Sequence, residues 1–202
     1  MEAALGIRVK SGWASAVLVG AGNGSPVFLH RGRLLLSDPR VPKSSQPYHR
    51  GFGRLQKNDA ILERLTGIVY QAAARSFGSL VADCTTKGHR PTTVALVVGS
   101  TIDPERIGNE HIRAHASEAR LFRVALERAA SAVDLPCAVV RERDLRALVS
   151  RPGSEWAVRI DNLGRAAGRP WAADEKLAAR AAWASLANIV VAGASRTYAD
   201  TD

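Results

Sequence analysis

The sequence lacks the features that mark disulfide-linked, secreted and membrane proteins. Its 202 residues include two cysteines, Cys84 and Cys137, and no Cys-x-x-Cys pair or Cys/His cluster. This scarcity argues against a disulfide framework and predicts two free, buried thiols in a reducing compartment. No secretory leader pattern is present, and no apolar run is long enough to span a membrane. We therefore expect a cytoplasmic protein with no membrane segment.

Common nucleotide and esterase motifs are missing as well. There is no Walker A sequence and no Gly-x-Ser-x-Gly nucleophile elbow. The glycines of residues 20–25 lie between two strand-like runs, not between a strand and a helix, which disfavours a dinucleotide-binding loop. The chain is also too short for an actin-like ATPase, which needs two domains of a related fold.

Acidic residues are scarce in the first part of the chain. Residues 1–58 hold nine Lys/Arg against two acids, so they contribute +7 to a formal net charge of +9. A field of one sign favours polyanions such as nucleic acid, nucleotides or anionic surfaces. An arginine-rich composition with solvated side chains would give the same count, and the sequence leaves both interpretations open.

Hydrophobic periodicity predicts an alternation of strands and helices. Alternating apolar residues predict three strands joined by tight turns, over residues 4–10, 13–19 and 26–36. Short apolar, β-branched runs predict two buried strands, over 92–99 and 137–140. Apolar residues at helical spacing predict four helices, over 58–85, 109–133, 144–149 and 172–192. Segments 37–56 and 151–170 are rich in proline and glycine and are predicted to be loops.

The predicted order is β-β-β-α-β-α-β-α-α. An antiparallel three-stranded meander followed by βαβ crossovers yields an α/β fold with a mixed five-stranded sheet and helices on both faces. We expect a single domain over residues 1–192 and a flexible tail over 193–202. This order matches the ribonuclease H-like fold.

Two motifs sharpen the match. Residues 6–14, Gly-Ile-Arg-Val-Lys-Ser-Gly-Trp-Ala, resemble the opening of the RuvC/YqgF-type Holliday-junction resolvases, which begin Gly-Ile-Asp-x-Gly. Residues 171–182 resemble the last helix of that group, in which acids precede an Ala/Leu-rich core helix. The resemblance implies a nuclease that gathers carboxylates from the first strand, the fourth strand region and the last helix around two divalent metals, Mg²⁺ or Mn²⁺.

The chain departs from this pattern at the first-strand acid, where Arg8 stands, and neither Val9 nor Lys10 restores a carboxylate. A guanidinium at a ligand position repels a divalent cation, so the replacement argues against ordinary two-metal catalysis. Paired with Asp174 or Glu118, Arg8 would form a salt bridge in place of the metal. The acids that remain as catalytic candidates are Asp103, Glu118, Asp174 and Glu175. Acids in the first turn of a helix, as at 174 and 175, are also favoured by the helix dipole alone.

A second candidate site lies on the predicted helix 109–133. His111, His115 and Glu118 are spaced i, i+4 and i+7, which places them on one helix face. Such a set offers ligands for a transition metal or acid/base groups for a metal-dependent hydrolase. An amphipathic helix whose first turns project beyond the core would show the same spacing.

Nucleic acid is the partner that the charge pattern and the resemblance share. We expect a ribonuclease H-like protein that binds nucleic acid and is either a divergent nuclease or a relative that has lost catalysis. The residues expected to grip phosphate are Arg8, Lys10, Arg31, Arg33 and Arg50. Residues 48–52, Tyr-His-Arg-Gly-Phe, mix aromatic and basic groups that suit a stacked strand, or they pin the loop to the core. The alternative is a non-enzymatic interaction subunit that uses the same fold and its basic hairpin to contact an acidic protein partner.

Overall fold

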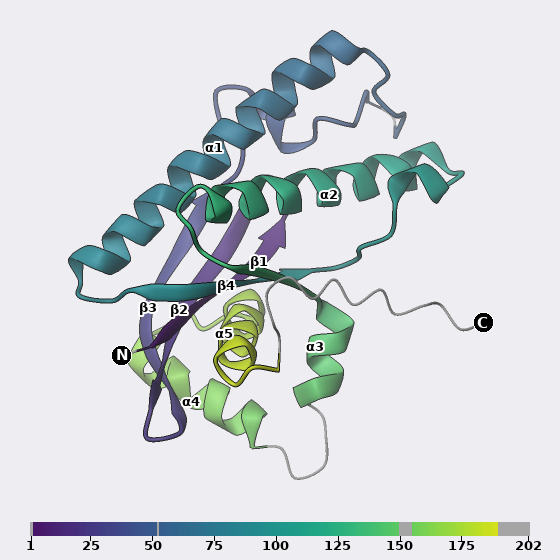
Figure 1. The fold of residues 1–202 in the computed structure, drawn as a ribbon. Helices are drawn as coiled ribbons and strands as arrows, with labels where there is room; N and C mark the ends of the chain where they lie inside the picture. The colour runs from purple at the N-terminus through teal and green to yellow at the C-terminus, as the bar shows by residue number, and fades with distance from the viewer. Residues whose placement is uncertain (1, 52, 150–154, 190–202) are drawn as a thin grey trace.

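A computed structural model describes residues 2–51, 53–149 and 155–189 of the chain (Figure 1). The strands are β1 (Ala3–Lys10), β2 (Trp13–Gly22), β3 (Ser25–Leu35), β4 (Pro91–Val98) and β5 (Cys137–Arg141). The helices are α1 (Asp59–Thr86), α2 (Glu110–Ser131), α3 (Glu142–Val149), α4 (Trp156–Ala167) and α5 (Ala173–Leu186). Two short 3₁₀ helices, η1 (Pro42–Ser45) and η2 (Pro104–Arg106), lie in the connections after β3 and β4.

The strands form one mixed five-stranded sheet in the order β3-β2-β1-β4-β5. β1, β2 and β3 pair antiparallel, whereas β4 pairs parallel to β1 and to β5. Asn23 and Gly24 close the β2–β3 hairpin with positive φ angles of 48° and 72°, as a tight two-residue turn requires. The predicted fold class, a meander followed by βαβ crossovers, is confirmed.

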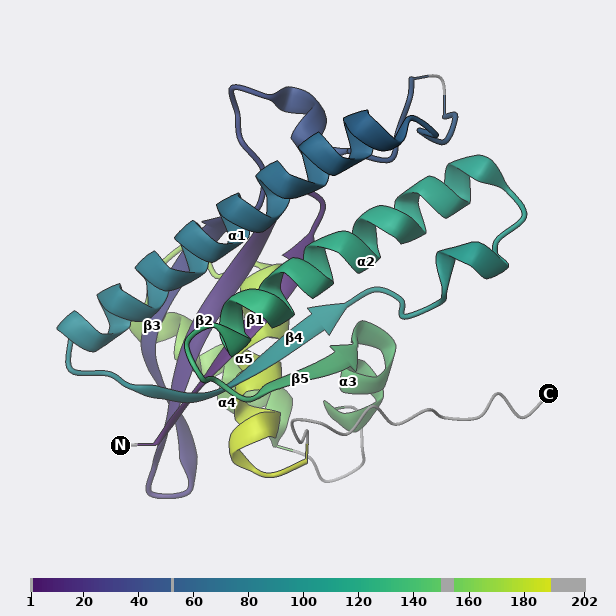
Figure 2. The same ribbon diagram turned by 45° about the horizontal axis from the view of Figure 1, so that its top comes forward.

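Helices cover both faces of the sheet (Figures 1 and 2). α1 and α2 lie on one face, and α3, α4 and α5 lie on the other. Alternate residues of β1 serve the two layers: Leu5, Ile7 and Val9 pack in the core cluster that contains Phe77 of α1 and Phe122 of α2. The intervening residues of β1 point toward the α5 layer, so Arg8 belongs to that face.

α5 packs unusually close to β1. A Cβ built on Gly6 would lie 1.8 Å from the carbonyl oxygen of Ala178 and 2.9 Å from the nitrogen of Ala182, both in α5. Only glycine allows this approach, and the small side chains of Ala178 and Ala182 permit it from the helix side. The contact sets the first turn of α5 beside the end of β1, where Arg8 lies.

Two sequence predictions are corrected by the structure. Residues 151–170 are not one loop, because α4 occupies Trp156–Ala167 and buries Ile160 and Leu163 against the β2–α5 layer. The prolines and glycines of this segment predicted a loop, but one of the glycines, Gly164, is a helical residue over which the Trp171 ring packs, 2.7 Å from where a Cβ would be. The last helix ends at Leu186 and not at 192, since Asn188 adopts a φ of +53° that no right-handed helix continues. The tail expected over 193–202 lies outside the described residues.

Within the described ranges, no helix has the length and apolar character needed to cross a bilayer. Cys84 and Cys137 are both free. Burial raises the pKa of each thiol, that of Cys137 to about 12, so neither is an activated nucleophile at neutral pH.

Candidate functional site

Arg8 lies at the carboxyl ends of the parallel strands, where α/β proteins commonly place their sites. Its side chain is only 9% exposed. Nη2 donates a hydrogen bond to Glu142 Oε2 at 2.5 Å, and Nη1 lies 3.3 Å from the Val97 carbonyl oxygen of β4. Nε lies 3.8 Å from Asp174 Oδ1, in the first turn of α5, and it has no hydrogen-bond partner among the described residues. The guanidinium therefore joins β1 to β4, to the start of α3 and to α5.

Both acids beside Arg8 have a second cation. Arg146 Nη2 lies 2.6 Å from Glu142 Oε1, and Lys10 Nζ lies 3.2 Å from Asp174 Oδ1. Burial opposes ionisation of Glu142, but the hydrogen bond from Arg146 and the charge of Arg8 outweigh it, so the pKa of Glu142 lies below its ordinary value. We call Arg8, Lys10, Arg146, Glu142 and Asp174 the arginine cluster. It is a closed network in which three cations neutralise two carboxylates.

The arginine cluster does not fit the pair of divalent metals that the resemblance implies. Mg²⁺ and Mn²⁺ need carboxylate oxygens that are free to coordinate them. Here each carboxylate already holds a cationic side chain at hydrogen-bond distance, and Arg8 places a fixed positive charge beside both. A metal ion at this position would have to displace the guanidinium from a buried position.

The four predicted catalytic acids do not converge. Asp174 joins the arginine cluster, but Glu175 pairs with Arg31 at 3.1 Å and accepts a hydrogen bond from the Ala172 nitrogen. Asp103 is an exposed residue that caps η2, lies 3.4 Å from Arg120 and lines a cavity of about 250 Å³ beside α2. Glu118 is fully buried between α2 and the loop after β3, where it contacts His49.

Sequence reasoning missed Glu142. It is the first residue after β5 and the first of α3, so it stands at the same sheet edge as Arg8. The sequence did contain a signal for it, because an acid that directly follows a predicted buried parallel strand is expected at the carboxyl ends of the strands. The predicted helix began at 144, which left Glu142 in a connection without an assigned role.

The predicted phosphate-binding cations have different surroundings. Arg8 and Lys10 are held in the arginine cluster, and Arg31 Nη1 donates to the Pro170 carbonyl oxygen at 2.5 Å as well as to Glu175. Arg33 is exposed, and its guanidinium lies 4.1 Å from the centre of the Trp13 ring. Arg50 is exposed on the loop after β3.

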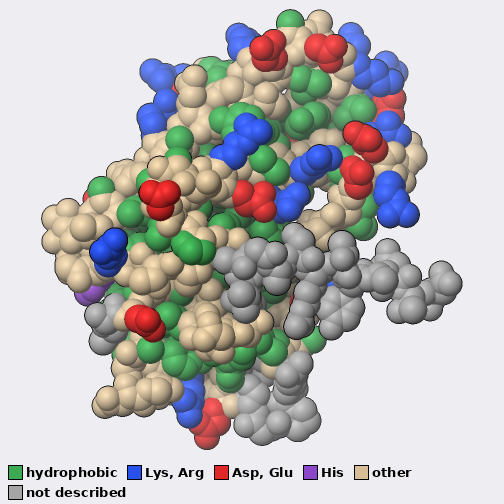
Figure 3. Space-filling model, viewed as in Figure 1, with side chains coloured by type: hydrophobic (Ala, Val, Ile, Leu, Met, Phe, Trp, Pro, Cys, Tyr) green, Lys and Arg blue, Asp and Glu red, His purple; other side chains and the backbone are tan. Residues whose placement is uncertain are grey.

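Strand register relates Arg33 to the arginine cluster. Arg8 pairs with Ser15 of β2, and Ser15 pairs with Arg33 of β3. Directly paired residues of neighbouring strands point to the same face of a sheet, so Arg8, Ser15 and Arg33 form one row on the α5 side. On the face shown in Figure 3, basic and acidic side chains are interspersed among the coloured residues, so charge is not segregated there.

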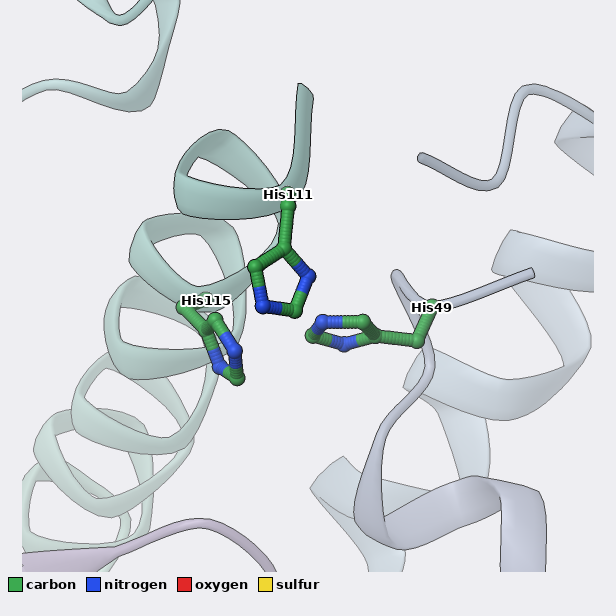
Figure 4. Close-up of side chains that lie close together, drawn as sticks. All are labelled: His49, His111 and His115. Atoms are coloured by element: carbon green, nitrogen blue, oxygen red, sulfur yellow. The ribbon is translucent and has the colours of Figure 1, made fainter. Parts of the chain in front are cut away.

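The structure brings together two of the predicted metal ligands, His111 and His115, and adds a third histidine (Figure 4). His49, from the loop after β3, points toward both rings, and one ligand nitrogen from each of the three residues lies within 4.8 Å of the others. Glu118 lies behind His49, with its Oε1 2.8 Å from His49 Nδ1. We call His49, His111 and His115 the histidine cluster. No spacing rule connects residue 49 to residue 111, so sequence reasoning assigned His49 to an aromatic and basic loop.

Comparison with known proteins shows similarity in structure alone. No protein-family model matches the chain, and no curated protein matches it. A structure of Thermus thermophilus RuvC has a TM-score of 0.55 at 13% sequence identity, covering 94% of this chain and 99% of that one. RuvC of the same organism in complex with a Holliday junction substrate has a TM-score of 0.56 at 11% identity, with 95% and 99% coverage. The chain therefore has a RuvC-like fold of the ribonuclease H type.

Proposed function

We propose that this protein binds nucleic acid through a RuvC-like fold and has lost two-metal cleavage. The observation that carries the proposal is Arg8, which is buried at the end of β1 with its guanidinium between Glu142 and Asp174. A cation at the centre of the site holds the surrounding elements together as a metal would. It cannot activate a water molecule or stabilise a leaving oxygen in the way that a metal ion does.

Binding is supported by two exposed cations, of which Arg33 lies on the same face as Arg8. Arg33 shares a row with Arg8, and its guanidinium is held over Trp13, where a planar cation remains free to contact a phosphate or a base. Arg50 adds an exposed cation on the loop after β3. The similar RuvC structure holds a Holliday junction, which makes branched DNA the first substrate to test.

The binding test measures affinity against salt. Fluorescence anisotropy with a labelled four-way junction, a duplex and a single strand should give a dissociation constant that rises steeply between 50 and 200 mM salt, as phosphate contacts require. Arg33→Ala and Arg50→Ala should each reduce the salt slope by about 1. Arg90→Ala, an exposed arginine just before β4 at the opposite edge of the sheet, is the matched control and should leave the slope unchanged.

Absence of binding to all three probes at low salt would refute the proposal. Co-purification with an acidic protein in a fixed ratio, without nucleic acid absorbance, would then favour the interaction-subunit alternative.

The cleavage test separates a lapsed nuclease from a divergent one. Junction DNA is incubated with the protein and Mg²⁺ or Mn²⁺, and the wild type is compared with Asp174→Asn. We expect no product from either protein above the background of a mock purification. Cleavage by the wild type that Asp174→Asn abolishes would show that an altered metal site is active and would overturn the loss of catalysis.

A further inference from the structure

We propose that His49, His111 and His115 bind one transition-metal ion of the zinc class, with Glu118 orienting His49 and a fourth coordination position open to solvent. This site is separate from the arginine cluster. It lies between the loop after β3 and the first turns of α2, on the other helical layer (Figure 2). The inference does not depend on nucleic acid binding.

The geometry needs little change to accept an ion. Three imidazole nitrogens at about 2.0–2.1 Å from a tetrahedral zinc ion lie about 3.3 Å from one another. The present nitrogens lie within 4.8 Å, so each has to move inward by only about 1 Å, which rotation of the side chains supplies. His111 and His115 are exposed, and the three rings already point toward one another (Figure 4).

Glu118 fixes the ring nitrogen that His49 offers. Glu118 Oε1 lies 2.8 Å from His49 Nδ1. A carboxylate there accepts a hydrogen bond from Nδ1–H, and this tautomer carries the lone pair on Nε2. His49 Nε2 is buried and has no hydrogen-bond partner among the described residues. A carboxylate behind a ligating histidine is the usual second layer of a protein zinc site.

Glu118 also needs a positive charge. Its side chain is 0% exposed, and Oε2 is buried with no hydrogen-bond partner in the part of the chain that the structure describes, although His115 Nδ1 lies 4.0 Å from it. A buried carboxylate is costly unless it is paired with a cation. A metal ion on His49 would supply that charge.

The loop is already shaped to hold His49 in place. The Gln56 nitrogen donates to the Tyr48 carbonyl oxygen at 2.8 Å, which closes a small hairpin around His49. Lys57 and Glu110 form an ion pair at 2.7 Å that ties the end of the loop to the start of α2. A bound ion would therefore join two segments that are already positioned, and little ordering entropy would oppose binding.

The test uses the full chain without a histidine tag, after chelation and dialysis. Co²⁺ is titrated and followed by visible absorption, which reports tetrahedral coordination, and Zn²⁺ is then added in competition. We expect one Co²⁺ per chain, displaced by Zn²⁺ in equal amount. His111→Ala should lower the affinity by about 100-fold or more, and Glu118→Gln by about 10–100-fold.

The matched control is the double substitution His30→Ala with His89→Ala, which removes both remaining histidines of the chain. It should bind Co²⁺ like the wild type. His111 is exposed on α2, so circular dichroism of His111→Ala should match that of the wild type. Failure of the wild type to bind Co²⁺, unchanged affinity in His111→Ala, or loss of binding in the double control would each overturn the proposal.

Discussion

Replacing Arg8 by methionine tests whether the arginine cluster holds the sheet edge together. Methionine keeps the length and most of the apolar stem of arginine but removes the charge. The change deletes the charged hydrogen bond to Glu142, the contact with the Val97 carbonyl oxygen and the attraction to Asp174. A hydrogen bond to a charged group contributes about 1.5–3 kcal/mol.

The loss of stability that we expect from Arg8→Met is moderate for the removal of a buried arginine. Removing one partner of a buried ion pair usually costs about 3–5 kcal/mol, because the other charge is left unpaired. Here Glu142 keeps Arg146, Asp174 keeps Lys10, and both acids are partly exposed. We therefore expect Arg8→Met to lower the free energy of unfolding by about 2 kcal/mol at pH 7. Urea unfolding followed by circular dichroism measures it.

Lowering the pH should reduce the difference in free energy of unfolding between the wild type and Arg8→Met. The pKa of folded Glu142 lies below its ordinary 4.5, partly because of Arg8, so the carboxylate stabilises the fold above pH 4.5. That contribution disappears as the pH falls through the lowered pKa. Without Arg8 the lowering is smaller, and Arg8→Met therefore has less stability to lose on acidification.

The matched control is Arg146→Met, which removes an arginine from the same carboxylate. Arg146 is 55% exposed, so its ion pair is worth less than about 1 kcal/mol. An Arg8→Met protein within about 0.5 kcal/mol of the wild type at pH 7, or a difference that does not become smaller as the pH falls below 4.5, would refute the reasoning.

Three further substitutions and one control test the packing and a helix cap by urea unfolding. Gly6→Ala would place a Cβ 1.8 Å from the Ala178 carbonyl oxygen, so α5 must retreat, and we expect a loss of about 3 kcal/mol. Gly67→Ala, whose Cβ meets nothing within 4 Å, is its control and should gain about 0.5–1 kcal/mol; equal stability of both variants would contradict the close packing of α5. Phe77→Ala, at a fully buried position, should cost about 3–5 kcal/mol. Asn58→Ala removes the cap of α1 and should cost about 1 kcal/mol; a smaller effect for Phe77→Ala than for Asn58→Ala would contradict the described core.

Local patterns in the sequence predicted most of the fold. β4 was predictable because its apolar run is buried on both faces, and α1 because Asn58 caps a regular apolar stripe. α4 was not predicted because prolines and glycines are frequent in its segment, and one of those glycines, Gly164, leaves the space that the Trp171 ring fills. This glycine is explained by its contact with Trp171, and a contact with a residue outside the helix cannot be inferred from the local periodicity of the sequence.

The candidate sites were predictable only where a single element carries them. Arg8 was noticed because it occupies the position of an acid in the first-strand motif. His111 and His115 were noticed because their spacing places them on one helix face. Glu142 and His49 complete the two clusters from elements distant in the chain, 134 residues from Arg8 in the first case. Their roles follow from the parallel pairing of β1, β4 and β5 and from the fold of the loop after β3. Tertiary contacts of this kind have no signature in spacing.

Arg8 is a cation tethered to the chain, and this changes what the sheet edge depends on. A metal ion must be drawn from solution, so a metal site weakens when the ion becomes scarce or a chelator is present. The guanidinium of Arg8 is part of the chain, so folding itself brings it to a fixed position at the end of β1. We therefore expect that the arrangement of β1, α3 and α5 at the carboxyl ends of the strands does not depend on the magnesium concentration. The surface beside it should keep one shape at metal concentrations too low to fill the site of a metal-dependent nuclease.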